Sequence, residues 1–253
     1  MRSLIVTVAG SATRFNRDTE EQTLKCLYHI GSPKKCLLYQ IFDKARDVDE
    51  FIVVGGFLYD KLTDFIKTDC AEFAAKITTV YNPLFAEYGS GYSLVKGVES
   101  LSGNSDEVVF VEGDLFFDKA EFARILNSEK DVITVNHELI DARKAVILYE
   151  TEEGRFKYLY DTSHKTLIIN EPFLAIYNSG QICIFKSVDG LKIAVTNLTA
   201  KQIQGTNLEI IQSYFGNMNR SDVEIVPMTV WYNCNTVADY KKVYSIIENE
   251  NVE

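Results

Sequence analysis

The stretch Ser3-Leu4-Ile5-Val6-Thr7-Val8-Ala9 runs directly into Gly10-Ser11-Ala12-Thr13-Arg14-Phe15. The first seven residues are mostly apolar and β-branched, which is typical of a buried strand. The small residues that follow allow a tight turn whose successive backbone N–H groups can bind an anion. Arg14 and, further along, Lys25 add one forked and one point-like positive charge. We therefore predict a strand followed by a phosphate-binding turn, with an ordinary strand-to-loop turn as the alternative.

Two familiar phosphate-binding motifs do not describe this turn. The Walker A spacing, Gly-x-x-x-x-Gly-Lys-Ser/Thr, is missing from the chain after Gly10. The dinucleotide fingerprint is also missing, because no further glycines follow at the required spacing and no helical pattern begins at once. Neither motif therefore accounts for the two cations near this turn, Arg14 and Lys25.

Composition limits the classes of protein to which the chain can belong. Its 253 residues suffice for one α/β domain, or for a domain with a subsidiary lobe. The formal net charge of −10 argues against nucleic-acid or anionic-membrane partners, so an anionic ligand needs local cations or a metal. There is no long apolar run and no secretory segment, so we expect a cytoplasmic protein. The cysteines are scattered and predict reduced thiols without a zinc site: Cys26, Cys36, Cys70, Cys183 and Cys234.

Apolar strands alternate with amphipathic helices along the first half of the chain. This pattern predicts a three-layer α/β/α fold with a mostly parallel, mixed central sheet. Right-handed crossovers place the loops that follow the strands along one edge, where ligands bind. The expected strands after the first are 51–56, 77–81 and 108–111, and the expected helices are 34–46, 59–73, 92–101 and 119–126.

Glu112-Gly113-Asp114 follows one of these strands and should lie at the same sheet edge as Gly10. A carboxylate there can hold magnesium together with substrate phosphates. We therefore predict Asp114 as a magnesium ligand, with a turn aspartate or helix cap as the alternative. Asp118 is the expected N-cap of the helix that follows.

The second half of the chain is less regular. We expect antiparallel strands at 144–149, 154–161 and 166–169, strands at 180–186 and 223–228, and helices from about 189, at 207–215 and at 236–249. Together these elements predict a single domain spanning 1–253. Its nucleotide-binding part covers about 1–135, and an acceptor-side lobe covers about 136–225.

Several segments match known motifs in order. Two segments resemble the nucleotide-sugar pyrophosphorylase and cytidylyltransferase superfamily. They are the turn at residues 9–15 and, after it, Leu24-Lys25-Cys26-Leu27-Tyr28-His29-Ile30-Gly31-Ser32-Pro33. That superfamily carries Ala-x-Gly-x-Gly-Thr-Arg and then a lysine in Pro-Lys-x-Leu-x-x-Ile-x-Gly-x-Pro. Three further segments are similar to motifs of the CTP:phosphocholine cytidylyltransferase-like branch and keep their order. They are Asn82-Pro83-Leu84-Phe85, Gly91-Tyr92-Ser93-Leu94 and Val111-Glu112-Gly113-Asp114. The resemblance spans most of 1–126 and returns at 231–240, and it implies a Rossmann-like nucleotidyltransferase fold.

Two positions depart from the superfamily pattern, and a third fits it with the less common of two residues. Ala12 stands where a second glycine is usual, and Leu24 stands where a proline precedes the lysine. The late metal-binding segment of the superfamily ends in aspartate or asparagine, and here Asn235 occupies that place. An amide oxygen can ligate magnesium, but an asparagine at the start of the last helix can equally serve as its N-cap.

The resemblance implies transfer of a nucleotide to a small phosphorylated acceptor with release of pyrophosphate, and it favours CTP over the other nucleoside triphosphates. The acceptors to consider are phosphocholine, a phosphonate, a phosphoamide such as phosphoglutamine, and a sugar 1-phosphate. The expected pathway is the modification of cell-surface polysaccharide. The site that the resemblance implies comprises Arg14 with Ala9, Gly10, Ser11, Ala12 and Thr13 for the phosphates, Lys25 for the α-phosphate, Asp114 and Asn235 for Mg²⁺, and Gly91, Tyr92 and Ser93 near the base. Tyr92 can equally be a core residue. Arg143 and Lys144 are candidates to contact an anionic acceptor, with an exposed strand pair as the alternative.

Other chemistries fit the sequence less well. A glycosyltransferase would carry an Asp-x-Asp motif, which Asp114-Leu115-Phe116 does not supply, and a serine hydrolase would carry a Gly-x-Ser-x-Gly elbow. The three histidines lack metal-ligand spacing. Sugar-1-phosphate nucleotidyl transfer and a non-catalytic nucleotide-binding module remain alternatives. The sequence does not indicate an oligomeric state.

Overall fold

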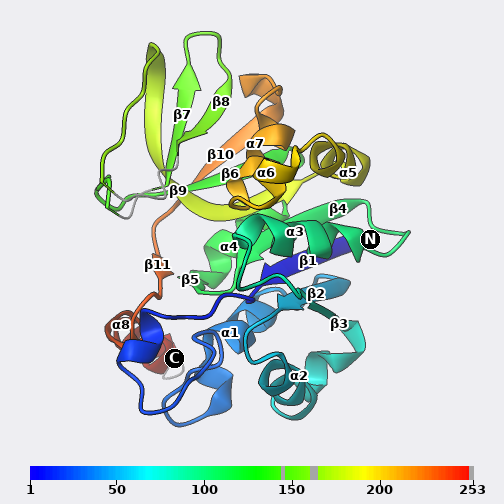
Figure 1. Cartoon of the computed structure of the whole chain (residues 1–253), viewed down its shortest axis with the longest axis vertical. Helices are drawn as coiled ribbons and strands as arrows, with labels where there is room; N and C mark the ends of the chain where they lie inside the picture. The colour runs from blue at the N-terminus through cyan, green and yellow to red at the C-terminus, as the bar shows by residue number, and fades with distance from the viewer. Residues whose placement is uncertain (144–145, 160–164, 251–253) are drawn as a thin grey trace.

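The centre of the molecule is a mixed sheet whose order is β10-β6-β9-β4-β1-β2-β3 (Figure 1). The computed structural model describes residues 1–143, 146–159 and 165–250. Within the sheet, β1 lies parallel to both β2 and β4, whereas β9 runs antiparallel to β4 and β6. The strands are β1 (Arg2–Thr7), β2 (Glu50–Gly55), β3 (Ile77–Tyr81), β4 (Glu107–Glu112), β6 (Asp131–Asn136), β9 (Phe173–Phe185) and β10 (Val223–Met228).

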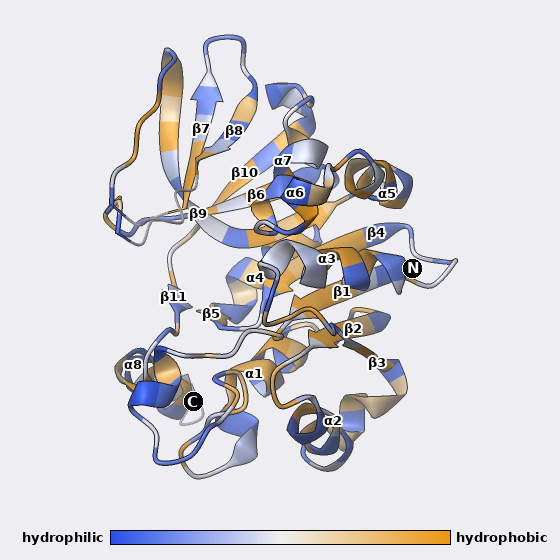
Figure 2. Cartoon of the chain, in the orientation of Figure 1, coloured by the Kyte–Doolittle hydropathy of each residue, from blue (hydrophilic) through white to orange (hydrophobic). Residues whose placement is uncertain are grey.

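Helices cover both faces of this sheet, which confirms the predicted three-layer α/β fold. One face packs against α1 (Leu37–Lys44), α2 (Tyr59–Thr68) and α4 (Lys119–Leu126), and the other against α3 (Ser90–Glu99), α5 (Val188–Thr196) and α7 (Leu208–Phe215). Because side chains alternate along a strand, Leu4 and Val6 of β1 enter the first core and Ile5 enters the second. Figure 2 shows the resulting hydrophobic centre between helices with hydrophilic outer faces.

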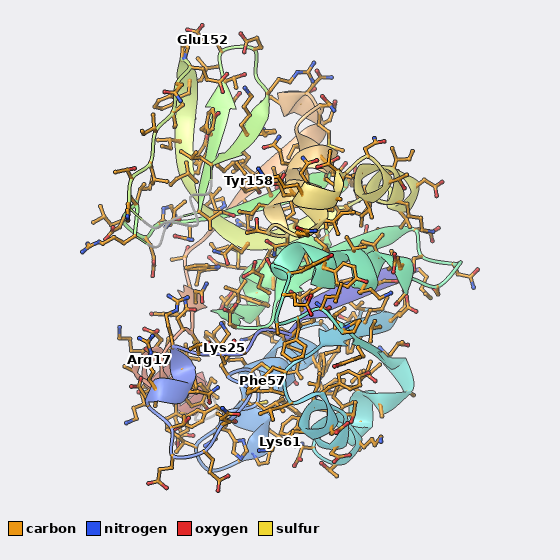
Figure 3. All side chains as sticks on the ribbon, viewed as in Figure 1. Arg17, Lys25, Phe57, Lys61, Glu152 and Tyr158 are labelled. Atoms are coloured by element: carbon orange, nitrogen blue, oxygen red, sulfur yellow. The ribbon has the colours of Figure 1, made fainter. Side chains whose placement is uncertain are left out.

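A projection extends from one end of the sheet. It consists of β7 (Ile147–Thr151), β8 (Phe156–Leu159) and the first half of β9, and Glu152 lies in the turn at its tip (Figure 3). A small separate ladder pairs β5 (Leu115–Phe117) with β11 (Trp231–Asn233). The short α6 (Ala200–Ile203) precedes α7, and α8 (Val237–Glu250) ends the described chain.

The structure corrects several predicted elements. Residues 166–169 form no strand, β9 begins well before the predicted 180–186, and the sequence analysis missed β6. The predicted helix 34–46 is divided by Cys36 into a 3₁₀ turn, Pro33–Lys35, and α1. The predicted helix 59–73 ends at Thr68, and a second 3₁₀ segment, Ala71–Lys76, follows it.

Two expectations about the chain as a whole can be checked directly. All five cysteines lie in the described ranges, and each is buried and unpaired. In the part of the chain that the structure describes, no helix combines the length and apolar character needed to cross a bilayer.

Candidate active site

The loops after β1 and β4 meet at one edge of the sheet, as predicted. Thr7 pairs with Glu112 in register, and the Gly113 N–H donates to the Thr7 carbonyl at 3.1 Å. A Cβ at Gly113 would lie 2.2 Å from Cγ1 of Val8 and 3.1 Å from that carbonyl. Only a residue without a side chain therefore allows the two loops to approach this closely.

Gly113→Ala is expected to destabilise the protein by about 1–3 kcal/mol, because the added methyl overlaps the β-branched Val8. Urea unfolding midpoints measure the change. Gly103→Ala is the matched control, since a Cβ there meets nothing within 4 Å. Equal midpoints for the two variants would show that the contact between the loops is loose.

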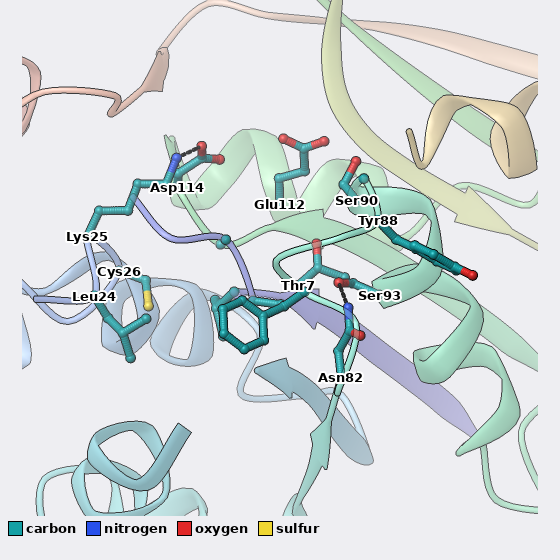
Figure 4. A pocket seen from close by; sticks show the side chains of 16 residues that line it. Thr7, Leu24, Lys25, Cys26, Asn82, Tyr88, Ser90, Ser93, Glu112 and Asp114 are labelled. Carbon is teal, nitrogen blue, oxygen red and sulfur yellow. Dashed lines mark hydrogen bonds and ion pairs between the residues drawn. The ribbon is translucent and has the colours of Figure 1, made fainter. Parts of the chain in front are cut away.

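The joined loops border a cavity of about 190 Å³ (Figure 4). Inside it, the Lys25 ammonium forms an ion pair with Oδ2 of Asp114. Burial alone would lower the pKa of Lys25, but the neighbouring Asp114 carboxylate outweighs that effect and raises it. Lys25 is therefore held as a cation. The cavity is lined by Thr7, Val8, Ala9, Gly10, Leu24, Lys25, Cys26, Asn82, Phe85, Tyr88, Gly89, Ser90, Ser93, Glu112, Gly113 and Asp114.

Asp114 keeps one oxygen without a partner. The residue is buried, and its Oδ1 accepts no hydrogen bond from any residue in the described ranges. A buried, unpaired carboxylate oxygen is costly unless a ligand satisfies it. The alternative of a helix cap is wrong for Asp114, because Asp118 caps α4 by accepting the Glu121 N–H at 2.7 Å, as predicted.

The turn after β1 presents a row of free donors. For the part of the chain that is described, no protein acceptor takes a hydrogen bond from the backbone N–H groups of residues 10–14. Asn16, which the sequence analysis missed, holds the turn in place by donating to the carbonyls of Ser11 (3.2 Å) and Thr23 (3.1 Å). Ala12 has a φ of +51°, in the left-handed region where glycine is favoured, so this alanine holds a strained backbone conformation within the turn. Such a row of N–H groups can bind an anion.

Arg14 and Asn235 meet beside this turn. The Arg14 guanidinium donates to Oδ1 of Asn235 at 2.9 Å. The two residues line a second recess of about 200 Å³, together with Ala12, Thr13, Phe15 and Lys25. Because Lys25 also lines the first cavity, its ammonium lies where the two recesses adjoin.

The small β5–β11 ladder explains how Asn235 reaches this place from the far end of the chain. Asn233 pairs with Leu115, and the next residue, Cys234, donates its N–H to the Asp114 carbonyl at 2.8 Å. The alternative role of Asn235 as a helix cap is wrong. Thr236 caps α8 instead, because its Oγ1 accepts the Asp239 N–H at 3.2 Å.

The three residues that the resemblance places near the base have different environments. Ser93 lines the first cavity, and its Oγ accepts a hydrogen bond from the buried Asn82 amide at 2.9 Å. Gly91 contacts the backbone of residues 205–206, where a Cβ would lie 2.9 Å from the Thr206 carbonyl oxygen. Tyr92 packs edge-on against Tyr88 with ring centroids 5.4 Å apart. Of the three, only Ser93 therefore faces the cavity.

Glu112 is a cavity residue whose side chain the sequence analysis overlooked. It is the last residue of β4, two residues before Asp114, and both residues line the cavity. Its Oε1 accepts a hydrogen bond from the Asn207 amide at 2.6 Å. Burial and the nearby Asp114 charge raise the pKa of Glu112 to about 7. Its position at the carboxyl end of a buried strand, the edge where ligands bind, was the signal that could have identified it.

Of the two residues predicted to contact the acceptor, the structure describes Arg143, which is not among the residues that line the cavity. Arg143 is exposed and forms an ion pair with Asp141 in its own loop. Lys144 lies outside the described residues.

The model of the family described as "Domain of unknown function (DUF6564)" matches residues 21–247, most of the chain. This chain is a DUF6564 protein. The DUF6564 chain is also 23% identical over 255 residues to the choline-phosphate cytidylyltransferase of Streptococcus pneumoniae, with 98% of this chain and 99% of that protein covered.

Solved structures share the fold of the DUF6564 chain. The inositol-1-phosphate CTP transferase of T. maritima has a TM-score of 0.70 at 17% identity, covering 98% of this chain and 95% of that one. A UDP-glucose pyrophosphorylase complexed with UDP-glucose has a TM-score of 0.71 at 13% identity, covering 99% of both chains. The sequence and structural neighbours are therefore members of the nucleotidyltransferase superfamily, as predicted, and the Rossmann-like nucleotidyltransferase fold is confirmed.

Proposed function

We propose that this DUF6564 protein is a nucleotidyltransferase, and that it transfers CMP from CTP to a small phosphorylated acceptor with release of pyrophosphate. The main support is the convergence of residues distant in sequence. Lys25 contacts Asp114, Arg14 contacts Asn235, and both pairs adjoin the free N–H groups of residues 10–14. A triphosphate offers the several adjacent anionic groups that such donors bind.

In the proposed reaction an acceptor phosphate or phosphonate oxygen attacks the α-phosphorus of the triphosphate. A new P–O bond forms in line with the bond that breaks, and pyrophosphate leaves with the bridging oxygen and its electron pair. The turn N–H groups and Arg14 would bind the β- and γ-phosphates, while Lys25 would contact the α-phosphate and the attacking oxygen. The protein thus aligns two polyanions and stabilises the charge of the transition state, without a covalent enzyme intermediate.

The residues present fit a magnesium ion held mainly by the substrate. Among the described residues, no group of three or more His, Cys, Asp and Glu side chains is arranged to bind a metal. Magnesium commonly uses one or two protein carboxylates together with substrate phosphates. The unpartnered Oδ1 of Asp114 suits that role, and Asn235 would contribute its amide oxygen. When bound, the ion would act as a Lewis acid on the phosphates.

Two neighbours support the preference for CTP, because each is named for the transfer of a cytidine nucleotide. The S. pneumoniae relative is a choline-phosphate cytidylyltransferase, and the T. maritima structure is an inositol-1-phosphate CTP transferase. The Asn82 and Ser93 pair lines the cavity and offers polar atoms to a base edge.

Pyrophosphate release tests the proposal. The purified protein is incubated with Mg²⁺, each of the four nucleoside triphosphates and a panel of phosphorylated acceptors. We expect pyrophosphate with CTP and at least one acceptor, and none when the acceptor is omitted. A nucleoside diphosphate product would indicate a glycosyltransferase, and the absence of any product across the panel would indicate a non-catalytic nucleotide-binding module.

A further inference from the structure

Three side-chain amides form a row that ends at Arg14. Asn235 donates from Nδ2 to Oδ1 of Asn233 at 2.7 Å, and Asn233 donates from Nδ2 to Oε1 of Gln181 at 3.5 Å. At the near end of the row, the Arg14 guanidinium donates to Oδ1 of Asn235 at 2.9 Å. The proposed reaction uses Arg14 and Asn235, but it gives no role to Asn233 or Gln181.

Arg14 fixes the direction of every amide in this row. A guanidinium only donates hydrogen bonds, so Asn235 has to turn its oxygen toward Arg14. The Nδ2 group of Asn235 then faces Asn233, which has to present its own oxygen and turn its Nδ2 group toward Gln181. A reversed amide at any position would set two donors or two acceptors against each other, and the lost hydrogen bonds make that arrangement unfavourable.

The strand β11 carries Asn233 to this place. Trp231 and Asn233 lie two residues apart in β11, so their side chains share a face. On that face the Trp231 indole donates to the carbonyl of Gly180 in β9 at 2.7 Å, immediately before Gln181. The contact between the two strands therefore places the side chain of Asn233 beside that of Gln181.

The strand β9 is irregular where it meets β11. Its register against β6 shifts between Ile133 and Val135, and Gln181 has a φ of +57°, a strained conformation for a residue with a side chain. Irregularities of this kind redirect a side chain and are frequent next to active sites. Such strain persists where the surrounding contacts determine the conformation. The irregular backbone therefore directs the Gln181 side chain toward Asn233.

We infer that Asn233 is a positioning residue, supported by Gln181, and that it keeps the Asn235 oxygen directed at Arg14 and into the site. In the proposed function, on which this inference rests, Asn235 would ligate Mg²⁺ through the same oxygen. An amide has one end that can ligate a metal, whereas both oxygens of a carboxylate can do so. An asparagine in this role therefore needs a neighbour that fixes its orientation.

Calorimetry with the Mg²⁺ complex of a non-hydrolysable CTP analogue tests this role. Asn233→Leu removes the acceptor and keeps a side chain of similar size. We expect it to raise the Kd about ten- to a hundredfold, the usual effect of removing a residue that orients a metal ligand. Gln181→Met removes only the longer bond of the row and should raise the Kd by a smaller factor. An unchanged Kd in both variants would overturn the inference.

A second background separates orientation from a merely structural role. In Asn235→Asp both side-chain oxygens are alike, so no neighbour has to orient them. Adding Asn233→Leu to Asn235→Asp should therefore leave the Kd nearly unchanged. An equal loss in both backgrounds would show that Asn233 only supports the fold, and it would refute the positioning role. Asn197→Leu, at the exposed C-terminal end of α5, is the matched control and should bind as the wild type does.

Proton–nitrogen NMR spectra of the ligand-free protein distinguish this inference from the proposed function. We expect the Nδ2 protons of Asn235 to show the shift of a hydrogen-bonded amide, and to lose it in Asn233→Leu. An Asn235 signal that Asn233→Leu does not change would contradict the inference, whatever the protein turns over. If the shift is present and no triphosphate or acceptor yields pyrophosphate, the result counts against the proposed function alone.

Discussion

Lys25→Ala is expected to lower the rate of pyrophosphate release by about 10²- to 10³-fold, the usual effect of removing a donor from a transition-state oxyanion. Lys25 is the residue that both recesses of the site share, and its pairing with Asp114 keeps it charged. No other lysine lines either recess within the described ranges, so none can replace it. Steady-state rates at saturating Mg²⁺ and CTP measure the loss.

Controls for this variant separate chemistry from folding. Removing Lys25 leaves the buried Asp114 without its cation, so part of any loss could come from a displaced loop. Lys25→Met retains most of the side-chain volume, and we expect it to lose the same activity while circular dichroism shows a folded protein. Lys67→Ala, on the exposed surface of α2, should keep full activity. Near-normal turnover in Lys25→Ala would refute the role proposed for this residue.

Asp114→Asn is expected to reduce turnover by about 10²- to 10³-fold and to raise the Mg²⁺ concentration required for half-maximal rate. The amide keeps the size of the side chain but removes the charge that would attract the ion and that pairs with Lys25. Varying Mg²⁺ at fixed CTP measures both effects. Direct Mg²⁺–nucleotide binding, followed by calorimetry, gives a second readout that does not depend on turnover.

Asp118→Asn is the matched control for Asp114→Asn, because it makes the same chemical change four residues along the chain. Asparagine is as good an N-cap as aspartate, so α4 should remain capped and activity unchanged. Equal Mg²⁺ requirements in Asp114→Asn and the wild type would contradict the assignment of Asp114 to the metal.

The sequence was sufficient to predict the part of the fold that builds the site. Strongly apolar strands such as β1 and β4 alternate with amphipathic helices, and that pattern places Gly10 and Asp114 at one edge. The Asp118 cap was also predictable, since an aspartate immediately before a helical pattern has few other roles.

Long-range pairing accounts for what the sequence did not reveal. β9 is a long strand because its halves pair with different partners, β4 and β6 at one end and β7 at the other, and no local pattern encodes those partners. Asn235 reaches Arg14 only through the β5–β11 ladder, so its sequence neighbours favoured the helix cap equally. Glu112 was overlooked because a partly buried glutamate at a strand end resembles an ordinary surface residue until the cavity around it is known.

A crystal structure of the protein with Mg²⁺ and a non-hydrolysable CTP analogue tests the central claim most directly. We predict that the triphosphate lies against the N–H groups of residues 10–14, between Arg14 and Lys25, with the metal on Oδ1 of Asp114. A nucleotide bound elsewhere, or a tail that contacts none of these three side chains, would contradict the account.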